Sequence, residues 1–192
     1  KYLKDVMEWT KYIYPGKEFA YNTSLNFDHK QLLYASVNVS PKFGIFRPTW
    51  GFNYNQQFFD TRKYGAGKAL SKPLLSCSLD NNFALSETMN AAISLNAATS
   101  NADGFLMMKS YYSVDLRFDK SFANRTWIIY LSANDIFKTA KERWTMYGLG
   151  SDTIKDCYNY TRSISLQVTY NFNAKRSKYK GTGAGNEEKS RL

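Results

Sequence analysis

The sequence predicts an all-β fold: the portion of an antiparallel transmembrane β-barrel that about eight strands form, followed by a flexible C-terminal tail. Three observations predict this class. Apolar and polar residues alternate along successive segments, and large aromatic residues lie near the ends of these segments. The connections between the segments alternate between short and long. About 9 to 11 alternating residues are enough to cross the hydrocarbon core of a bilayer when the strand is tilted.

The clearest alternation lies at residues 160–172. Its apolar positions are Ile164, Leu166, Val168, Tyr170 and Phe172, and Ser, Gln, Thr or Asn residues stand between them. Because successive side chains of a strand point to opposite faces, this segment has one apolar and one polar face.

Seven further segments have the same pattern, with one parity apolar and the other rich in Asn, Ser, Asp and Arg. The eight predicted strands are residues 5–14, 31–40, 49–59, 73–85, 89–99, 111–120, 127–137 and 160–172. The connections 41–48, 86–88 and 121–126 are short, and the connections 15–30, 60–72, 100–110 and 138–159 are longer. Membrane barrels have short turns at one rim and long loops at the other. No segment has a helical apolar period.

Aromatic residues make up 17% of the 192-residue chain, with 15 Tyr, 13 Phe and 4 Trp. The large ones near strand ends are Trp50, Phe58, Phe83, Phe118, Trp127, Phe137, Tyr170 and Phe172. This distribution predicts aromatic girdles at both membrane interfaces. No run of 18 apolar residues occurs, which excludes a transmembrane helix. A soluble β-sandwich or lipocalin-like barrel is the alternative, but it has no reason to place aromatics at strand ends.

The chain is basic, with 26 Lys and Arg against 16 Asp and Glu and a formal net charge of +10. Such a balance suits nucleic acid or an anionic lipid surface. No recognition helix or RNA-binding aromatic motif is present, so we expect no nucleic-acid partner. Residues 1–173 form the strand region in this prediction, and residues 174–192 form a polar, basic, flexible tail.

Residues for catalysis or metal binding are scarce. The single histidine, His29, stands between the first two predicted strands, where a solvated residue is the ordinary outcome. Cys77 and Cys157 are too few for a disulfide framework and are expected to be unpaired. We therefore expect no enzyme activity, no cofactor and no metal site.

The polar parity of the strands supplies the candidate functional residues. The predicted lumen-facing residues are Asn53, Asn55, Asn96, Asp115, Arg117, Asp119, Asn134 and Gln167. Three aromatics of the predicted outer loops, Trp144, Tyr147 and Tyr158, are candidates for contact with a solute. Gln56, Asn81 and Arg162 depart from the pattern, because they fall on the apolar parity.

Several stretches together resemble the C-terminal part of the outer-membrane β-barrel family of Bacteroidetes, which belongs with the TonB-dependent receptors. The resemblance is carried by the SPKFG run at residues 40–44, the NDIF run at 134–137, the closing strand and the tail at 178–192. It covers essentially the whole chain. It implies a large plugged barrel in the Gram-negative outer membrane, energised by the TonB complex and importing a substrate.

The resemblance also implies an orientation, because the last strand of this family ends at the periplasmic rim. The short connections and the C-terminal tail are then periplasmic, and the long connections face outside. The expected partners are outer-membrane lipid and lipopolysaccharide, an unknown imported substrate, and N-terminal strands and a plug that this sequence lacks. Contact with TonB would be made through that missing portion.

A second hypothesis remains open. Eight strands can close into a small barrel filled with side chains, which would serve as a self-contained structural or adhesion protein. It predicts that residues 5–14 pair with residues 160–172.

Overall fold

The computed structural model describes residues 1–13, 16, 18–65, 69–157 and 160–172. It is built almost entirely of antiparallel strands, as predicted. They are β1 (Tyr2–Ile13), β2 (Ala20–Val39), β3 (Phe46–Phe58), β4 (Leu74–Ser86), β5 (Met89–Ala98), β6 (Asn101–Asp103), β7 (Leu106–Met108), β8 (Tyr111–Phe122), β9 (Trp127–Asn134), β10 (Glu142–Tyr147), β11 (Asp152–Cys157) and β12 (Ser163–Tyr170), with one 3-10 turn, η1 (Thr61–Tyr64).

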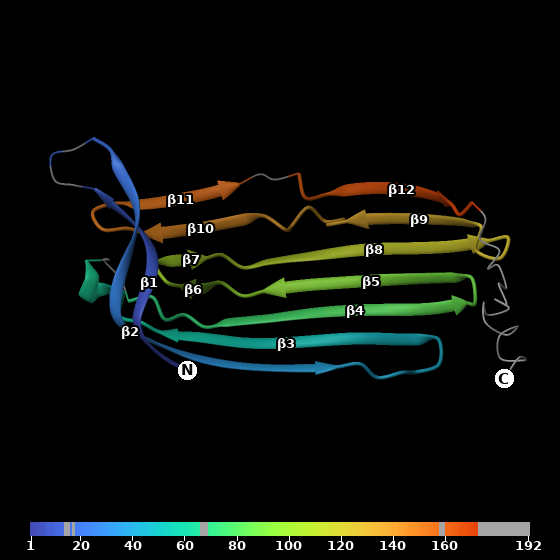
Figure 1. Cartoon of the computed structure of the whole chain (residues 1–192), viewed down its shortest axis with the longest axis horizontal. Coiled ribbons are helices and arrows are strands. Elements are labelled where there is room, and N and C mark those ends of the chain that lie inside the picture. The colour runs from blue at the N-terminus through green and yellow to red at the C-terminus, as the bar shows by residue number, and fades with distance from the viewer. Residues whose placement is uncertain (14–15, 17, 66–68, 158–159, 173–192) are drawn as a thin grey trace, which may run out of the picture.

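Eight of these strands form one sheet in the order β1-β2-β3-β4-β5-β8-β9-β12, and β11-β10-β7-β6 form a second. In Figure 1 the second sheet continues β5, β8, β9 and β12 beyond one end of the first. The described residues contain no helix with the length and apolarity of a membrane crossing.

The register gathers the apolar positions on a single face. Trp50 pairs with Val39 and Leu79, and the row continues through Leu95 to Val114. Directly paired residues share a face, and the pairs Leu116 with Ala133 and Ala133 with Ile164 extend the same face to β9 and β12, so the apolar parities of the main-sheet strands after β1 coincide. The pattern predicted from each strand alone is therefore continuous across the sheet.

This apolar face is left uncovered by the rest of the described chain. Leu33 is 51% exposed, Leu131 44% and Leu166 66%. The buried hydrophobic residues are few and lie mainly elsewhere: Phe27, Phe59, Leu70, Ala92, Ala102 and Phe105. A soluble β-sandwich would bury such a face against a second layer, so the uncovered face fits contact with lipid.

Aromatic residues pair across strands near the short turns. Phe46 stacks on Phe83 with ring centroids 5.0 Å apart, and Trp127 lies 4.5 Å from Tyr170. Asn81, which interrupts the apolar parity beside them, accepts a hydrogen bond from Trp50 Nε1 at 3.1 Å. The polar side chain of Asn81 on the apolar face thus has a hydrogen-bond partner within the protein.

The sorting of connections by length is seen in the fold. Figure 1 shows the turns β2–β3, β4–β5 and β8–β9 at the same end of the sheet, and the longer connections at the other. The β8–β9 turn is unusual, because Ala123, Asn124 and Arg125 all have positive φ (47°, 52° and 68°). Left-handed backbone in three successive non-glycine residues is strained.

The long connections contain strands that the sequence analysis missed. The predicted loop 15–30 is wrong from Ala20 onward, because β2 is 20 residues long and its first part pairs with β1. The predicted loop 138–159 contains β10 and β11, and the loop 100–110 contains β6 and β7. The predicted strands 127–137 and 160–172 shorten to β9 and β12.

The β1–β2 hairpin forms an arm that crosses the long-connection end of the sheet (Figure 1). The β10–β11 connection holds this arm: Leu149 N donates to Lys11 O at 2.7 Å, and Ile13 N donates to Leu149 O at 3.1 Å. Gly148 permits the approach, since a Cβ there would lie 2.7 Å from Lys11 O. Phe27 of the arm packs with Phe59 and Phe105 in the one cluster of buried apolar rings among the described residues.

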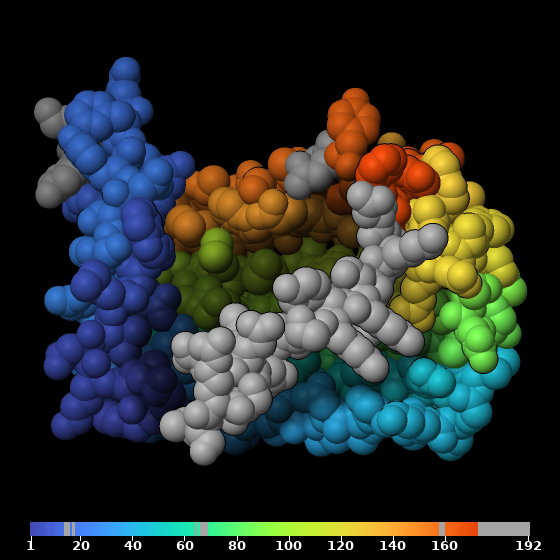
Figure 2. All heavy atoms as spheres, turned by 45° about the vertical axis from the view of Figure 1, so that its right-hand side comes forward, coloured from blue at the N-terminus to red at the C-terminus, as the bar shows by residue number. Residues whose placement is uncertain are grey.

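The main sheet is curved and open. In the space-filling view the middle strands are set back between β2–β3 and β9–β12, which leaves a hollowed face (Figure 2). In the described residues β12 pairs only with β9, and the part of β2 from Leu33 to Val39 pairs only with β3. The described part of the predicted strand 5–14 lies in β1, which pairs with β2 and not with β12, so the pairing that the second hypothesis predicts is absent from the described residues.

Candidate functional site: the polar face and the arm junction

The predicted lumen-facing residues all share the face opposite the apolar one. Asn53 pairs with Ser36 and Ser76, and Asn96 pairs with Ser78 and Ser113. The register places the other six, Asn55, Asp115, Arg117, Asp119, Asn134 and Gln167, on this same parity. A continuous wall of amides, hydroxyls and charges results.

Hydrogen bonds link neighbouring strands along this polar face. Asn90 Nδ2 donates to Asp119 Oδ2 at 2.7 Å, and Ser94 Oγ donates to Asp80 Oδ1 at 2.6 Å. Arg117 donates from Nη2 to Asn82 Oδ1 at 3.1 Å and has no carboxylate partner among the described residues. The face therefore offers hydrogen-bonding groups and, at Arg117, a guanidinium that no described carboxylate neutralises.

Asp135, directly after β9, is a buried carboxylate with several hydrogen bonds beside this face. It is 3% exposed and has a φ of 43°. Its Oδ1 accepts from Thr139 N at 2.9 Å, its Oδ2 accepts from Ala140 N at 3.1 Å, and the Thr161 hydroxyl also donates to it. Its own N–H donates to Asp115 Oδ1 at 2.7 Å. Asp135 thus fixes the segment between β9 and β10 against the start of β12.

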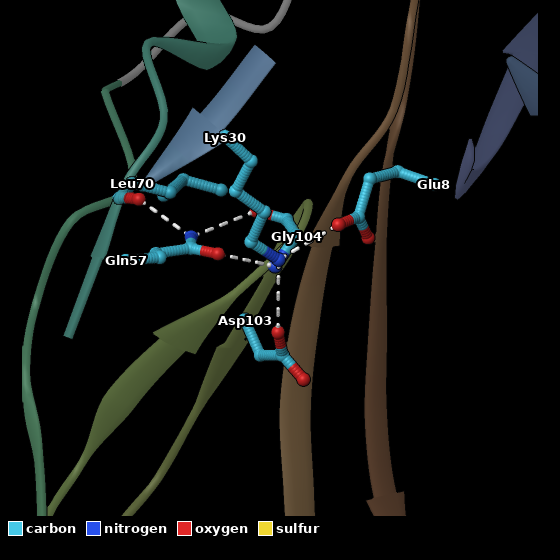
Figure 3. A network of polar contacts seen from close by, with 6 residues as sticks. All are labelled: Glu8, Lys30, Gln57, Leu70, Asp103 and Gly104. Carbon is cyan, nitrogen blue, oxygen red and sulfur yellow. Dashed lines mark hydrogen bonds and ion pairs between the residues drawn. The ribbon is translucent and has the colours of Figure 1, made fainter. Parts of the chain in front are cut away.

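A second polar cluster joins the arm to the sheet, and Figure 3 shows its residues converging from chain segments that are distant in sequence. Lys30 of β2 donates to Glu8 of β1 at 2.7 Å and to Asp103 of β6 at 3.3 Å. The side chains of Lys30 and Glu8 are 6% and 19% exposed. A buried charge needs such a partner to avoid a large desolvation cost.

Gln57 completes this arm junction by holding the β6–β7 turn. Gly104 N donates to Gln57 Oε1 at 2.8 Å, while Gln57 Nε2 donates to Leu70 O at 2.6 Å and to Gly104 O at 3.2 Å. Gly104 has a φ of +52°, and a Cβ there would lie 2.5 Å from the Glu8 carboxylate. Only glycine satisfies both demands.

Two of the three predicted outer-loop aromatics lie in a strand rather than in a loop. Trp144 and Tyr147 belong to β10, and Tyr158 lies outside the described residues. Trp144 Nε1 donates to Glu142 Oε1 at 3.0 Å, and Lys155 Nζ lies 5.6 Å from the Trp144 ring centroid. The hydrogen bond from Lys155, followed by the one from Trp144, lowers the pKa of Glu142. The bond between Lys155 and Glu142 also raises the pKa of Lys155.

The residue types that could bind a metal are apart from one another in the described ranges. His29 stacks on Tyr2 with ring centroids 5.7 Å apart. Among the described residues no group of three or more His, Cys, Asp or Glu side chains is arranged to hold a metal. Cys77 and Cys157 are both free thiols.

Sequence reasoning missed Asp135, Lys30 and Gln57 as organising residues. Asp135 stood in the NDIF run, which was noted only as part of a resemblance. Lys30 and Gln57 gave no signal, because their partners Glu8, Asp103 and Gly104 are far away in sequence. Contacts of this kind depend on the crossing of the arm, which no local pattern encodes.

Comparison with known proteins gives one match. The family model described as "Outer membrane protein beta-barrel family" matches residues 1–170. No curated protein and no solved structure matches the chain.

Proposed function

The chain belongs to the outer membrane protein beta-barrel family, and from this premise we propose that it is the C-terminal wall of a TonB-dependent-receptor-like protein that takes up a substrate across the outer membrane. The proposal includes no enzyme activity. It assigns the apolar face to lipid and the polar face, with Asn53, Asn96 and Arg117, to a water-filled or plugged lumen.

The observation that carries the proposal is the open, curved sheet. The backbone of β12 and the part of β2 at residues 33–39 each have an edge without a strand partner in the described chain. An open edge in lipid leaves backbone groups unsatisfied, at a cost of several kcal/mol for each group. Both edges therefore need further strands to pair with. In a large barrel, strands that precede this chain would pair with both edges.

The proposed orientation places the short turns in the periplasm and the long connections outside. Supporting this, the β10–β11, β6–β7 and β1–β2 elements stand together at the long-connection end (Figure 1). Longer and more elaborate connections are typical of the outer surface of such barrels. The tail at 174–192, which lies outside the described residues, would then be periplasmic.

The reading frame that encodes this chain tests the proposal directly. We expect it to encode further barrel strands, a plug region and a TonB-contact segment upstream of Lys1, and cells expressing it to accumulate an iron chelate or oligosaccharide only when TonB is present. A frame without a plug region, or uptake that is equal without TonB, would contradict the receptor role.

A small self-contained barrel is a second candidate, because the main sheet has the eight strands that such a barrel needs. Disulfide trapping distinguishes this small barrel from the wall of a larger receptor. In a background with Cys77→Ser and Cys157→Ser, one cysteine replaces Ser165 of β12, and a second replaces Ser36 of β2 or Glu8 of β1. The receptor proposal predicts no disulfide within the folded protein. Efficient cross-linking of either pair would favour the small barrel, because strand partners lie within disulfide reach.

A further inference from the structure

The sheet has a break between β8 and the segment that links β9 to β10. Regular pairing ends at Leu116 and Ala133 and resumes between Met108 of β7 and Trp144 of β10. Two backbone bonds lie within this interval: Ile136 N donates to Val114 O at 3.0 Å, and Lys109 N donates to Arg143 O at 2.9 Å. A cleft of about 300 Å³ opens here, and its lining includes Ser110, Tyr112, Lys138, Thr139, Lys141 and Arg143.

The charge of this cleft is positive. Within the described part of the chain, Lys138 and Arg143 form no ion pair, although Asp156 is the cross-strand neighbour of Arg143. Arg143 donates from Nη2 to Ser110 O at a long 3.4 Å, and its Nε is buried without an acceptor. The guanidinium therefore has donors that the protein does not use, which suits a phosphate group.

An apolar hollow of about 560 Å³ adjoins the cleft and shares Ser110 with it. Most of the residues that line it belong to the apolar face and come from β2, β3, β4 and β5, including Ala35, Phe52, Cys77 and Ala97. The small side chains Ala35, Cys77 and Ala97 leave a depression beside the Phe52 ring. A depression in a lipid-facing surface suits an acyl chain.

We propose that the cationic cleft and the apolar hollow form one binding site for a phosphorylated, acylated lipid of the outer leaflet. The phosphate binds Lys138 and Arg143, with Lys141 beside them, and an acyl chain follows the hollow past Ser110. Tyr112, on the apolar parity at the cleft, marks the level at which aromatic girdles meet lipid headgroups. The site rests on the proposed orientation and is independent of the uptake role.

Native mass spectrometry of the full-length protein in detergent tests this site with three probes. Dipalmitoyl phosphatidic acid carries both phosphate and chains, dipalmitoylglycerol carries the chains alone, and glycerol phosphate carries the phosphate alone. We expect wild-type protein to retain phosphatidic acid in preference to dipalmitoylglycerol. Lys138→Gln with Arg143→Gln should weaken this retention about tenfold or more, since each cation near an anionic lipid contributes appreciably.

A matched control removes the same charge elsewhere, through Lys42→Gln with Lys63→Gln, and should retain phosphatidic acid as wild type does. Ala97→Phe fills the hollow and should also weaken retention, with folding checked by heat-modifiable migration in gels.

Three results would overturn the proposal: equal loss in both double variants, equal retention of dipalmitoylglycerol, or displacement of phosphatidic acid by glycerol phosphate at comparable concentration. The last would assign the cleft to a soluble anion. None of these bears on the upstream reading frame or on TonB dependence.

Discussion

At the scale of single residues, two buried charges hold the irregular parts of the chain in place. Asp135 satisfies donors from Thr139, Ala140 and Thr161, which belong to the connections on either side of β10 and β11. Lys30 satisfies carboxylates of β1 and β6. These buried polar contacts hold the connections in place where no hydrophobic core does so, because the apolar face of the sheet is uncovered by the rest of the described chain.

Replacement of Asp135 by Ala should destabilise the fold strongly. It leaves the N–H groups of Thr139 and Ala140 without their acceptors, and an unsatisfied N–H costs up to about 1–3 kcal/mol, with less lost where water reaches a partly buried group. Urea unfolding followed by heat-modifiable migration measures the loss. Asp135→Asn keeps one carbonyl acceptor and should lose less, and equal stability of wild type and Asp135→Ala would refute this role.

The Lys30–Glu8 pair should show strong coupling. Lys30→Met strands the Glu8 carboxylate in a site where it is only 19% exposed, and breaking a buried pair from one side costs about 3–5 kcal/mol. Lys30→Met with Glu8→Gln removes that stranded charge and should recover part of the loss. A double-mutant cycle of unfolding free energies measures the coupling, and additive losses would show that the two side chains act independently.

At the scale of elements, the strands were predictable where one face is apolar and the other polar. The first part of β2 was missed although Tyr21, Leu25 and Phe27 stand on one parity, because the intervening charges and amides resemble a loop. β10 and β11 are six residues each and pair mainly with each other and with β7. Short polar strands of this kind gain stability from their neighbours rather than from their own pattern.

The β8–β9 turn should be improved by glycine. Ala123 has a φ of 47°, which costs an L-residue about 1–2 kcal/mol, whereas glycine adopts it freely. Because glycine also loses more chain entropy on folding, we expect Ala123→Gly to gain about 0.5–1 kcal/mol net. Ala92→Gly within β5, where no positive φ is needed, is the control and should be destabilising. A loss of stability in Ala123→Gly would show that the turn is not strained.

At the scale of the whole molecule, alternation predicted the two faces, the main sheet and the sorting of its connections. It did not predict the arm, because the crossing of β1 and β2 over the sheet depends on Phe27, Lys30 and Gln57 meeting residues from distant segments. The polar face was likewise predictable as a set, whereas the cleft beside Arg143 follows from a break in pairing that no strand pattern reveals.

The central claim is that this sheet places one face against lipid and the other against water. Cysteine scanning along β12 tests it most directly, in a Cys77→Ser, Cys157→Ser background of the full-length protein in lipid vesicles. With a charged maleimide, cysteines at Ser165 and Gln167 should react readily, and cysteines at Leu166 and Val168 should react about tenfold more slowly or not at all. Equal reactivity along the strand, or the opposite alternation, would contradict the account.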